Sequence, residues 1–500
     1  MRFSRTLLAF LLALAVVATA CTTGGGGEDE PATEESPTAA EDEPEAEPAA
    51  PADEAPADSV PAEDEPEPAA EAPENPAAED EPAESSSEPA PEPTPEPTPI
   101  VLTASFRGVT EDTIHIGIGF WDTTLFGFGF FGEPQLVWDA LVGAENADGG
   151  IFGRSLKASI AGFNPALPNE MLAACISLTE DHQVFAVLGG LRGDANFCVS
   201  EQHETIHIGS QVNARGELLE RARAPLASFR IEGTAREERF IAELARRGWF
   251  DGATAVGIHY DGSETQDQLG DAVEAAFADA GVEIAITMNI DDLVLDDDAL
   301  ESQSEIMQEQ VTDAGIDRMV IFGAAATGLI TYGELGIQMA AVDSTNFTTA
   351  TSSGIDPMAL DGTISSAVRL DLATDTVDAE TQECLDVVMA ALPDARFERP
   401  GPGVENSKED PNYWNYTVLA CRDLSLFVQI ATAAGPNLTN DSFQAGLDSL
   451  SQASLPEIPF LSFGPGKYNG NDTLRLVQFD GDADEDGELV GLGDPVDLTP

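Results

Sequence analysis

Apolar positions follow two alternating spacings along most of this chain. Residues 114–120 are a short apolar run of the kind that forms a buried strand, and apolar positions at residues 136–147 recur at helical spacing. Glycines at positions 149 and 150 can end that helix in a left-handed turn, and residues 155–161 predict a second strand. A strand, a crossover helix and a second strand predict a parallel sheet that is covered by helices.

The same alternation continues through the rest of the chain. Further strands are predicted at residues 184–188, 206–209, 225–230, 253–260, 283–288, 318–322, 338–342, 348–352, 362–368 and 474–479. Helices are predicted between most of these strands and at residues 379–392, 413–433 and 442–450. The fold class that this order indicates is α/β, with two doubly wound parallel-sheet lobes.

Two motifs in this pattern resemble a known family. Gly-Val-Thr-Glu-Asp-Thr-Ile-His-Ile-Gly (108–117) and Asn-Ala-Asp-Gly-Gly-Ile-Phe-Gly-Arg (146–154) are similar to the opening of leucine/isoleucine/valine-type periplasmic binding proteins, the solute-binding subunits of ABC importers. The resemblance covers about residues 108–479, and its most specific part is the second motif. It implies a hinged, type I periplasmic binding protein-like fold. Residues 106–230 and 370–470 would form lobe one, and residues 231–369 and 471–500 would form lobe two.

The N-terminus predicts export and anchoring. Arg2 and Arg5 precede an apolar run at residues 7–18, which is too short to span a bilayer and is typical of a signal peptide over residues 1–20. Ala18-Thr19-Ala20-Cys21 resembles a lipobox, although Ala18 replaces the more usual leucine. We therefore expect Cys21 to carry lipid that anchors the chain to the outer face of the cell membrane, with ordinary secretion as the alternative.

Charge and composition set the next segment apart. Residues 22–100 contain 26 acidic and no basic residues, and proline and alanine dominate the remainder. Such a segment cannot bury enough apolar surface to fold, so residues 21–105 are predicted to be a lipidated, disordered acidic tether. The whole chain carries a formal charge of −69, which argues against nucleic acid or acidic lipid as a partner. A partner-binding acidic tail and a preference for cationic ligands are the alternatives.

Four cysteines remain once Cys21 is assigned to lipid. Cys175 and Cys198 form one local pair, and Cys384 and Cys421 form another. Outside the cytoplasm these residues can form disulfides, with local pairing preferred among three possible connectivities. Neither pair has the Cys-x-x-Cys spacing of a metal site. The resemblance implies a disulfide near the first pair.

In open parallel sheets, ligands bind beyond the carboxyl ends of the strands. The aromatic loop at residues 121–131 follows the first strand and is interpreted as pocket lining, with a packed cover as the alternative. The candidate ligand-binding residues are Trp121, Thr123, Thr124, Gly190, Leu191, Arg192, Gln211, Asn213, Tyr260, Phe322, Gly323, Ser352 and Tyr416.

The chain departs from the family pattern for amino-acid binding at two positions. Family members that bind amino acids hold the α-carboxylate with Ser or Thr from lobe one and the ammonium with a lobe-two carboxylate. Here the loop at residues 189–193 has no Ser or Thr, and Ser352 stands about where an acid would be expected. An unpaired ammonium in a closed cleft is costly, which argues against a zwitterionic amino acid. Arg192 can instead contact a carboxylate, or form a salt bridge with Asp194.

Two motifs resemble metal-binding motifs, but the residues around them do not fit a metal site. His203-Glu-Thr-Ile-His207 matches a zinc-protease motif, but Thr205-Ile-His-Ile-Gly209 repeats a strand start, so the two histidines should point apart across a turn. The acidic segment at residues 482–487 resembles part of a calcium loop, but its twelfth position is Gly493 rather than an acid. We expect no enzyme activity, metal or cofactor.

The function predicted from the sequence is ligand capture. The chain would be an extracytoplasmic lipoprotein that closes over a small polar or amphipathic solute, such as an amino acid, an amide or a related compound. It would present that solute to the membrane subunits of an ABC permease. A sensory or scaffolding receptor domain of the same fold is the alternative.

Overall fold

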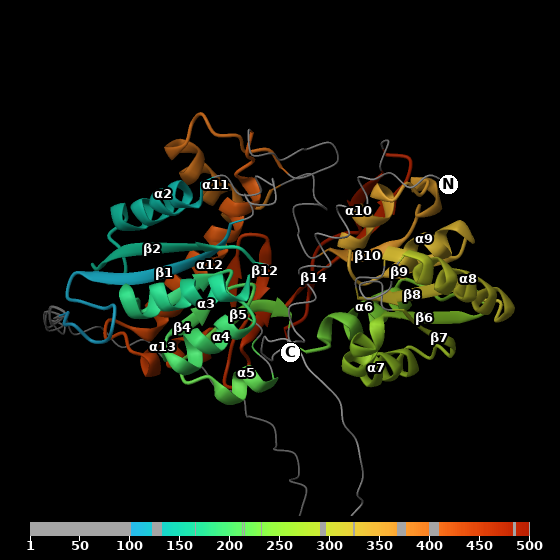
Figure 1. Ribbon diagram of the computed structural model, residues 1–500, viewed down its shortest axis with the longest axis horizontal. Helices are drawn as coiled ribbons and strands as arrows, with labels where there is room; N and C mark the ends of the chain where they lie inside the picture. Colours follow the sequence, from blue (N-terminus) through green and yellow to red (C-terminus); the bar gives the residue numbers. More distant parts are fainter. Residues whose placement is uncertain are drawn as a thin grey trace, which may run out of the picture. The chain divides into compact units, whose positions relative to one another are not determined.

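The computed structural model describes residues 102–122, 133–165, 167–212, 214, 216–231, 233–290, 297–323, 326–367, 377–399, 410–483 and 487–499. All of these residues belong to one compact unit. Cys21 and nearly all of the predicted tether lie outside the described residues. The described chain forms an α/β fold with two lobes, each built on one eight-stranded sheet (Figure 1).

The lobe-one sheet has the order β11-β12-β13-β5-β4-β3-β1-β2. Its parallel part is formed by β1 (Thr113–Trp121), β2 (Ser155–Phe163), β3 (Ala186–Gly189), β4 (Ile206–Ile208) and β5 (Leu226–Ile231). The strands β11 (Ala453–Leu455), β12 (Ile458–Leu461) and β13 (Asn469–Asn471) extend the β5 edge. Alternate residues of β1, such as Ile114 and Ile116, point into the larger core cluster of this lobe.

Helices cover both faces of this sheet. The larger core lies under α2 (Pro134–Ala147), α11 (Ala379–Ala391), α12 (Trp414–Ala434) and α13 (Asn440–Ser449). The opposite face packs against α3 (Pro168–Ile176) and α4 (Asp194–Phe197), which are followed by the π-helical turns η3 (Ser177–Asp181) and η4 (Cys198–Gln202). A short helix, α5 (Gly216–Arg221), precedes β5.

The lobe-two sheet has the order β15-β14-β10-β9-β8-β6-β7. Its strands are β6 (Val256–Asp261), β7 (Ile284–Ile290), β8 (Arg318–Phe322), β9 (Gln338–Ala341), β10 (Ile364–Ala367), β14 (Thr473–Asp480) and β15 (Glu488–Gly491), with β16 (Val496–Asp497) paired to β14. One face packs against α6 (Ala235–Arg246) and α7 (Gly262–Asp279). The other packs against α8 (Asp297–Asp313), α9 (Ala326–Glu334) and α10 (Thr345–Ser352), with the 3₁₀ turn η5 (Pro357–Ala359) nearby.

The two sheets interleave along the chain. β1–β5 build lobe one, β6–β10 build lobe two, β11–β13 return to lobe one, and β14–β16 return to lobe two. The periodicity of the sequence could not assign these late segments to a sheet. The hydrogen-bonded strand order does.

The predicted α/β fold with two lobes is confirmed, and two details differ from the sequence prediction. The sheets are mixed rather than fully parallel, because β14 pairs antiparallel with β10 and β12 pairs antiparallel with β13. Residues 348–352 were expected to be a strand but belong to α10. The threonines there favour a strand locally, yet Phe347 and Ala350 are buried together in the core at helical spacing, and this packing overrides the local preference.

The motif at residues 146–154 holds the amino end of the lobe-one sheet together. The Asn146 side chain donates to the carbonyl of Leu156 at 3.0 Å and accepts from its N–H at 2.6 Å. Arg154 is buried, and its guanidinium donates to the carbonyls of Thr110, Pro436 and Thr103 at 2.7–2.9 Å. The most specific motif of the resemblance therefore has a structural role: its hydrogen bonds connect segments at the amino end of the sheet, away from the carboxyl ends of the strands.

Helix α12 is the one described helix that is long and apolar enough to cross a membrane. More than half of it is buried, and Leu426, Phe427 and Ile430 are fully enclosed in the lobe-one core. Its apolar character is that of a core helix.

Candidate functional site

The carboxyl ends of β1 and β3 bring three of the predicted residues together. The Trp121 indole N–H donates to the carbonyl of Gly190 at 2.8 Å. The guanidinium of Arg192 lies over the Trp121 ring, 4.9 Å from its centroid, and donates to the carbonyl of Pro165 at 3.0 Å. We call Trp121, Gly190 and Arg192 the lobe-one tip cluster. It combines a large aromatic face with a fixed positive charge, both of which suit a ligand that has apolar and polar parts.

Glycine is required within this cluster. A Cβ atom on Gly190 would lie 2.9 Å from both Cδ1 and Nε1 of Trp121, so any larger residue would displace the indole. Leu191 differs from its neighbours in the loop, because its side chain is fully buried against Gly119 on the α3 face of the sheet. Among the candidates in this loop, Leu191 is therefore a core residue.

Three more lobe-one candidates fall outside the described residues: Thr123, Thr124 and Asn213. Gln211 is partly buried on the turn that follows β4. The carbonyl of Ser210 in the same turn accepts from Arg230 at 3.0 Å. The turn after β4 is thus tied to β5, which holds the region next to Gln211 in place.

The lobe-two candidates are placed differently. Tyr260 and Phe322 are paired across β6 and β8, are stacked with ring centroids 5.4 Å apart, and are almost fully buried in the core beneath α7. Burial raises the pKa of Tyr260 to about 12, and Glu274 contributes to the shift. Among the described residues, the Tyr260 hydroxyl has no hydrogen-bond partner.

Gly323 lies at the strand tip itself. Its backbone is in the left-handed region at φ +88°, where glycine is favoured, and its carbonyl accepts from the Asn346 side chain at 2.9 Å. Ser352 is the last residue of α10. Sequence reasoning missed Asn346, whose buried side chain holds the loop after β8 through its bond to Gly323, and the polar start of α10 gave no signal that set it apart.

Tyr416 is buried in the lobe-one core and accepts a hydrogen bond from Trp138 Nε1 at 3.0 Å. Burial raises the pKa of Tyr416, and nearby Asp423 adds to this rise. Tyr413, one turn earlier, accepts from the backbone N–H of Glu133 at 3.2 Å. Both tyrosines fasten the start of α12 to the start of α2.

Asp423 is the residue at the strand tips that sequence reasoning missed. It lies on the core-facing stripe of α12, is 2% exposed, and its Oδ1 has no hydrogen-bond partner within the described part of the chain. Cβ atoms built on Gly209 and Gly189 would lie 3.3 Å and 3.7 Å from its two oxygens, so the carboxyl sits directly beneath these tips. Burial raises the pKa of Asp423 well above its ordinary value, while neighbouring Arg422 opposes this rise. An acid in step with Tyr416, Phe427 and Ile430 was the signal for it.

The zinc-protease motif lies across a turn, as the sequence indicates. His203 follows η4, Glu204 adopts a positive φ of 47°, and His207 lies within β4. His207 is fully buried, burial lowers its pKa to about 3, and neither ring nitrogen has a partner among the described atoms. His207 is a core residue of the sheet.

The cysteines lie in the two local pairs that the sequence favoured. The sulfur atoms of Cys175 and Cys198 are 2.11 Å apart, which is the distance of a disulfide. Cys384 and Cys421 form the second pair and join α11 to α12. The suggested calcium segment lies partly outside the described residues.

Similar folds are found among solved structures. A periplasmic binding protein type 1 from Bordetella pertussis Tohama I matches with a TM-score of 0.52 at 14% identity, over 77% of this chain and 100% of that one. The chain has the type 1 periplasmic binding protein fold. An ABC transporter substrate-binding protein from Desulfitobacterium hafniense in complex with Leu matches with a TM-score of 0.50 at 15% identity, over 76% of this chain and 100% of that one.

A solute-binding protein of an ABC transporter from R. palustris, in complex with 4-hydroxybenzoate, matches with a TM-score of 0.50 at 13% identity. The match covers 78% of this chain and 98% of that one. No protein-family model matches the sequence, and no curated protein is similar enough to count as a relative. At these identities the likeness shows the type 1 periplasmic binding protein fold, and the solute has to be argued from the residues of this chain.

Proposed function

We propose that this protein is the solute-binding lipoprotein of an ABC importer. It captures a small polar or amphipathic solute by closure of its two lobes around a hinge. The observation that carries this proposal is the type 1 periplasmic binding protein fold, matched over the full length of a known binding protein. An ABC transporter substrate-binding protein in complex with Leu and a solute-binding protein in complex with 4-hydroxybenzoate are among the solved structures that the chain resembles.

The lobe-one tip cluster supports a solute with both an apolar and a polar part. Trp121 offers a flat apolar face, and Arg192 offers charged donors beside it. A carboxylate or carbonyl of the solute would meet Arg192, and its apolar part would stack on Trp121. Trp121, Gly190 and Arg192 are the residues that we assign to lobe-one recognition, with Gly323 contributing from the lobe-two tips.

The direct test is mass spectrometry of any small molecule released from the purified protein by denaturation, followed by titration of that compound. Closure would appear as a smaller radius of gyration in solution scattering when the compound is added. If no compound co-purifies and a panel of amino acids, amides and aromatic acids gives neither a thermal shift nor compaction, solute capture is wrong.

Trp121→Ala tests the assigned site. Solute affinity should fall by about tenfold or more, because a large aromatic contact is a typical binding hot spot. Trp249→Ala is the matched control, since Trp249 is buried in the lobe-two core away from the tips. The control should lower stability but leave affinity close to that of the wild type. Equal losses of affinity in both variants would contradict the assignment.

Anchoring is the second part of the proposal. Cleavage before Cys21 and lipidation of its thiol would hold the protein at the outer face of the cell membrane, and the oxidising surroundings would keep both cysteine pairs as disulfides. Cys21→Ser should move the protein from the detergent phase to the aqueous phase in detergent partitioning. A wild-type protein found in the aqueous phase would contradict lipid anchoring.

A further inference from the structure

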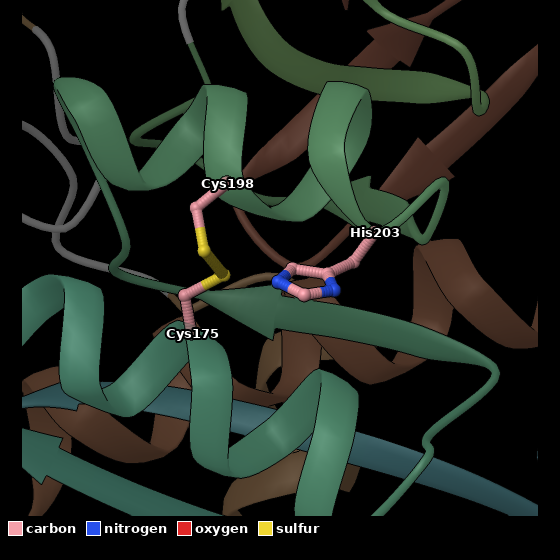
Figure 2. Close-up of side chains that lie close together, drawn as sticks. All are labelled: Cys175, Cys198 and His203. Carbon is pink, nitrogen blue, oxygen red and sulfur yellow. A yellow bond between two sulfur atoms is a disulfide. The ribbon is translucent and has the colours of Figure 1, made fainter.

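Side chains of types that can ligate a metal ion lie together on the lobe-one face opposite to α12. The sulfur atoms of Cys175 and Cys198 and a ring nitrogen of His203 all lie within 4.8 Å of one another. Figure 2 shows the imidazole of His203 with its edge turned toward the two sulfur atoms. A fourth group is close, because Oε1 of Glu180 lies 3.6 Å from Nε2 of His203.

The backbone brings these side chains together in an unusual way. Both cysteines adjoin π-helical turns: η3 follows the helix of Cys175 and contains Glu180, and η4 begins at Cys198. In η4 the N–H of His203 donates to the carbonyl of Cys198 at 3.1 Å. This bond returns the chain to the same side after five residues, whereas an α-helix would carry His203 well past Cys198. Single π-helical turns are rare, and they occur frequently at functional sites.

We propose that Cys175, Cys198 and His203, with Glu180 as the fourth ligand, form a redox-gated site for a thiophilic divalent cation, of which Zn²⁺ is the test case. As a disulfide the two cysteines cannot bind the cation. As thiolates they complete a set of two sulfurs, one imidazole nitrogen and one carboxylate oxygen, which suits tetrahedral zinc. Zinc bonds of about 2.0–2.3 Å keep tetrahedral ligand atoms roughly 3.3–3.8 Å apart, so the spacing of Cys175, Cys198 and His203 needs only a small adjustment beyond breaking the S–S bond.

The chemistry balances with an external dithiol as reductant. The dithiol transfers two electrons and two protons to the Cys175–Cys198 bond and itself becomes a cyclic disulfide, which leaves two thiols on the protein. Zn²⁺ then binds both sulfurs as thiolates, and the two thiol protons are released. A disulfide oxidant reverses the process: it takes two electrons from the thiolates and takes up two protons, the S–S bond forms again, and Zn²⁺ leaves.

The four side chains of the site differ in their exposure to solvent. Cys175 is fully buried and Cys198 is 2% exposed, so a bound cation would be shielded from water on its sulfur side. His203 and Glu180 lie toward solvent, with 18% and 59% of their side chains exposed, and they provide the route for the cation. The site lies apart from the strand tips, and its test does not depend on solute capture.

The experiment uses the full chain with Cys21→Ser, Cys384→Ser and Cys421→Ser, so that Cys175 and Cys198 are the only thiols. The protein is incubated with a dithiol until thiol counting shows two free thiols, and the reductant is then removed without oxygen. Zinc affinity is measured by competition with a chromogenic chelator, and Co²⁺ is added in parallel to detect thiolate-to-metal charge-transfer bands.

The reduced protein should bind one Zn²⁺, and the oxidised protein should not compete with the chelator. His203→Ala should weaken binding by at least about tenfold, the loss that even an outer partner of a zinc ligand causes. The matched control is His182→Ala, an exposed histidine beside η3, which should leave affinity unchanged. Equal affinity in the oxidised and reduced protein, or in His203→Ala and the reduced parent, overturns the proposal.

A second arm covers failure of the triple variant to fold. The full chain with only Cys21→Ser is compared with the same chain carrying Cys175→Ser and Cys198→Ser, both after reduction. Only the former should show charge-transfer bands with Co²⁺. Identical bands in both chains would place the metal at Cys384 and Cys421 and would overturn the site proposed here.

Discussion

Both lobes have aromatic residues at the carboxyl ends of their strands, but the side chains are buried to different degrees. In lobe one, Trp121 lies at the end of β1 and contacts the next loop through Gly190. In lobe two, Tyr260 and Phe322 also lie at or next to strand ends, yet their side chains are enclosed in the core beneath α7. An aromatic residue at a strand end is therefore either enclosed in the core, as Tyr260 and Phe322 are, or only partly buried at the edge of a core, as Trp121 is.

The largest expected effect is a loss of stability when an aromatic side chain at the lobe-two strand ends is removed. Phe322→Ala should lower the free energy of unfolding by about 3–5 kcal/mol, because it empties a fully buried position between β6, β8 and α7. Denaturant unfolding of the solute-free protein measures this loss. Trp121→Ala, measured alongside, should cost clearly less, since that side chain is only partly buried. If both variants lost similar amounts of unfolding free energy, the aromatic residues at the two sets of strand ends would not differ in their contribution to the core.

The buried acid of lobe one gives the next effect. Asp423→Asn should raise the free energy of unfolding near neutral pH by about 1–3 kcal/mol, because the variant cannot ionise and the wild type must keep its carboxyl neutral in the fold. The raised pKa means that, above the ordinary aspartate pKa, the unfolded chain loses a proton that the folded chain retains. Wild-type stability therefore falls as pH rises through this window, by up to about 1.4 kcal/mol per pH unit.

Unfolding measured at several pH values between 3 and neutrality checks the sign. The difference between Asp423→Asn and the wild type should grow with pH and vanish at the acid end. Glu383→Gln on the exposed side of α11 is the control, and it should show no such growth. A difference that stays constant with pH would show that Asp423 ionises freely in the fold.

Gly190→Ala tests whether solute affinity depends on the position of the Trp121 indole in lobe one. The added Cβ would approach the Trp121 ring to 2.9 Å, so the indole must turn away and lose its bond to the Gly190 carbonyl. We expect solute affinity to fall by about tenfold, together with a stability loss of about 1 kcal/mol for the lost hydrogen bond. Isothermal titration and unfolding measure the two changes. Gly143→Ala in α2, where a Cβ meets open space, should leave affinity intact.

The smallest effect concerns the Tyr260 hydroxyl. Tyr260→Phe should leave affinity unchanged and leave stability equal or up to about 1 kcal/mol higher, because the removed hydroxyl has no partner among the described atoms. Thermal unfolding with and without solute measures both. A loss of affinity would show that this hydroxyl reaches the solute and that Tyr260 belongs to the site.

The fold was more predictable from sequence than the site. Strand and helix periods gave most elements of both sheets, because burial repeats every two or every three to four residues wherever an element packs. The strand prediction at residues 348–352 was wrong since threonine preference is local, whereas Phe347 and Ala350 are placed by the core beneath them. The short strands β11–β13 carry too few residues for a period to show.

The site residues were harder to predict than the fold, because some side chains at strand ends pack into the core and others lie at the edge of the sheet. Trp121 and Arg192 lie together because Trp121 ends β1, Arg192 follows β3, and these neighbouring parallel strands end at the same edge of the sheet. Leu191, Tyr260 and Phe322 lie at or just after strand ends but point into cores, and for strand residues this depends on which face of the sheet the position occupies. Tyr416 was expected at the cleft on the start of a helix, but it is buried against Trp138 in the lobe-one core. Asp423 escaped notice because its contacts, Gly189 and Gly209, lie more than 200 residues away in sequence.

The interleaving of the two sheets along the chain has a consequence for folding. Neither sheet is complete until its last strands emerge, because β11–β13 finish the first and β14 finishes most of the second. Each sheet therefore keeps an incomplete edge until strands from beyond residue 450 join it. A chain cut near residue 470 would thus lack strands of both sheets at once, and the unpaired strand edges left in both lobes would favour aggregation.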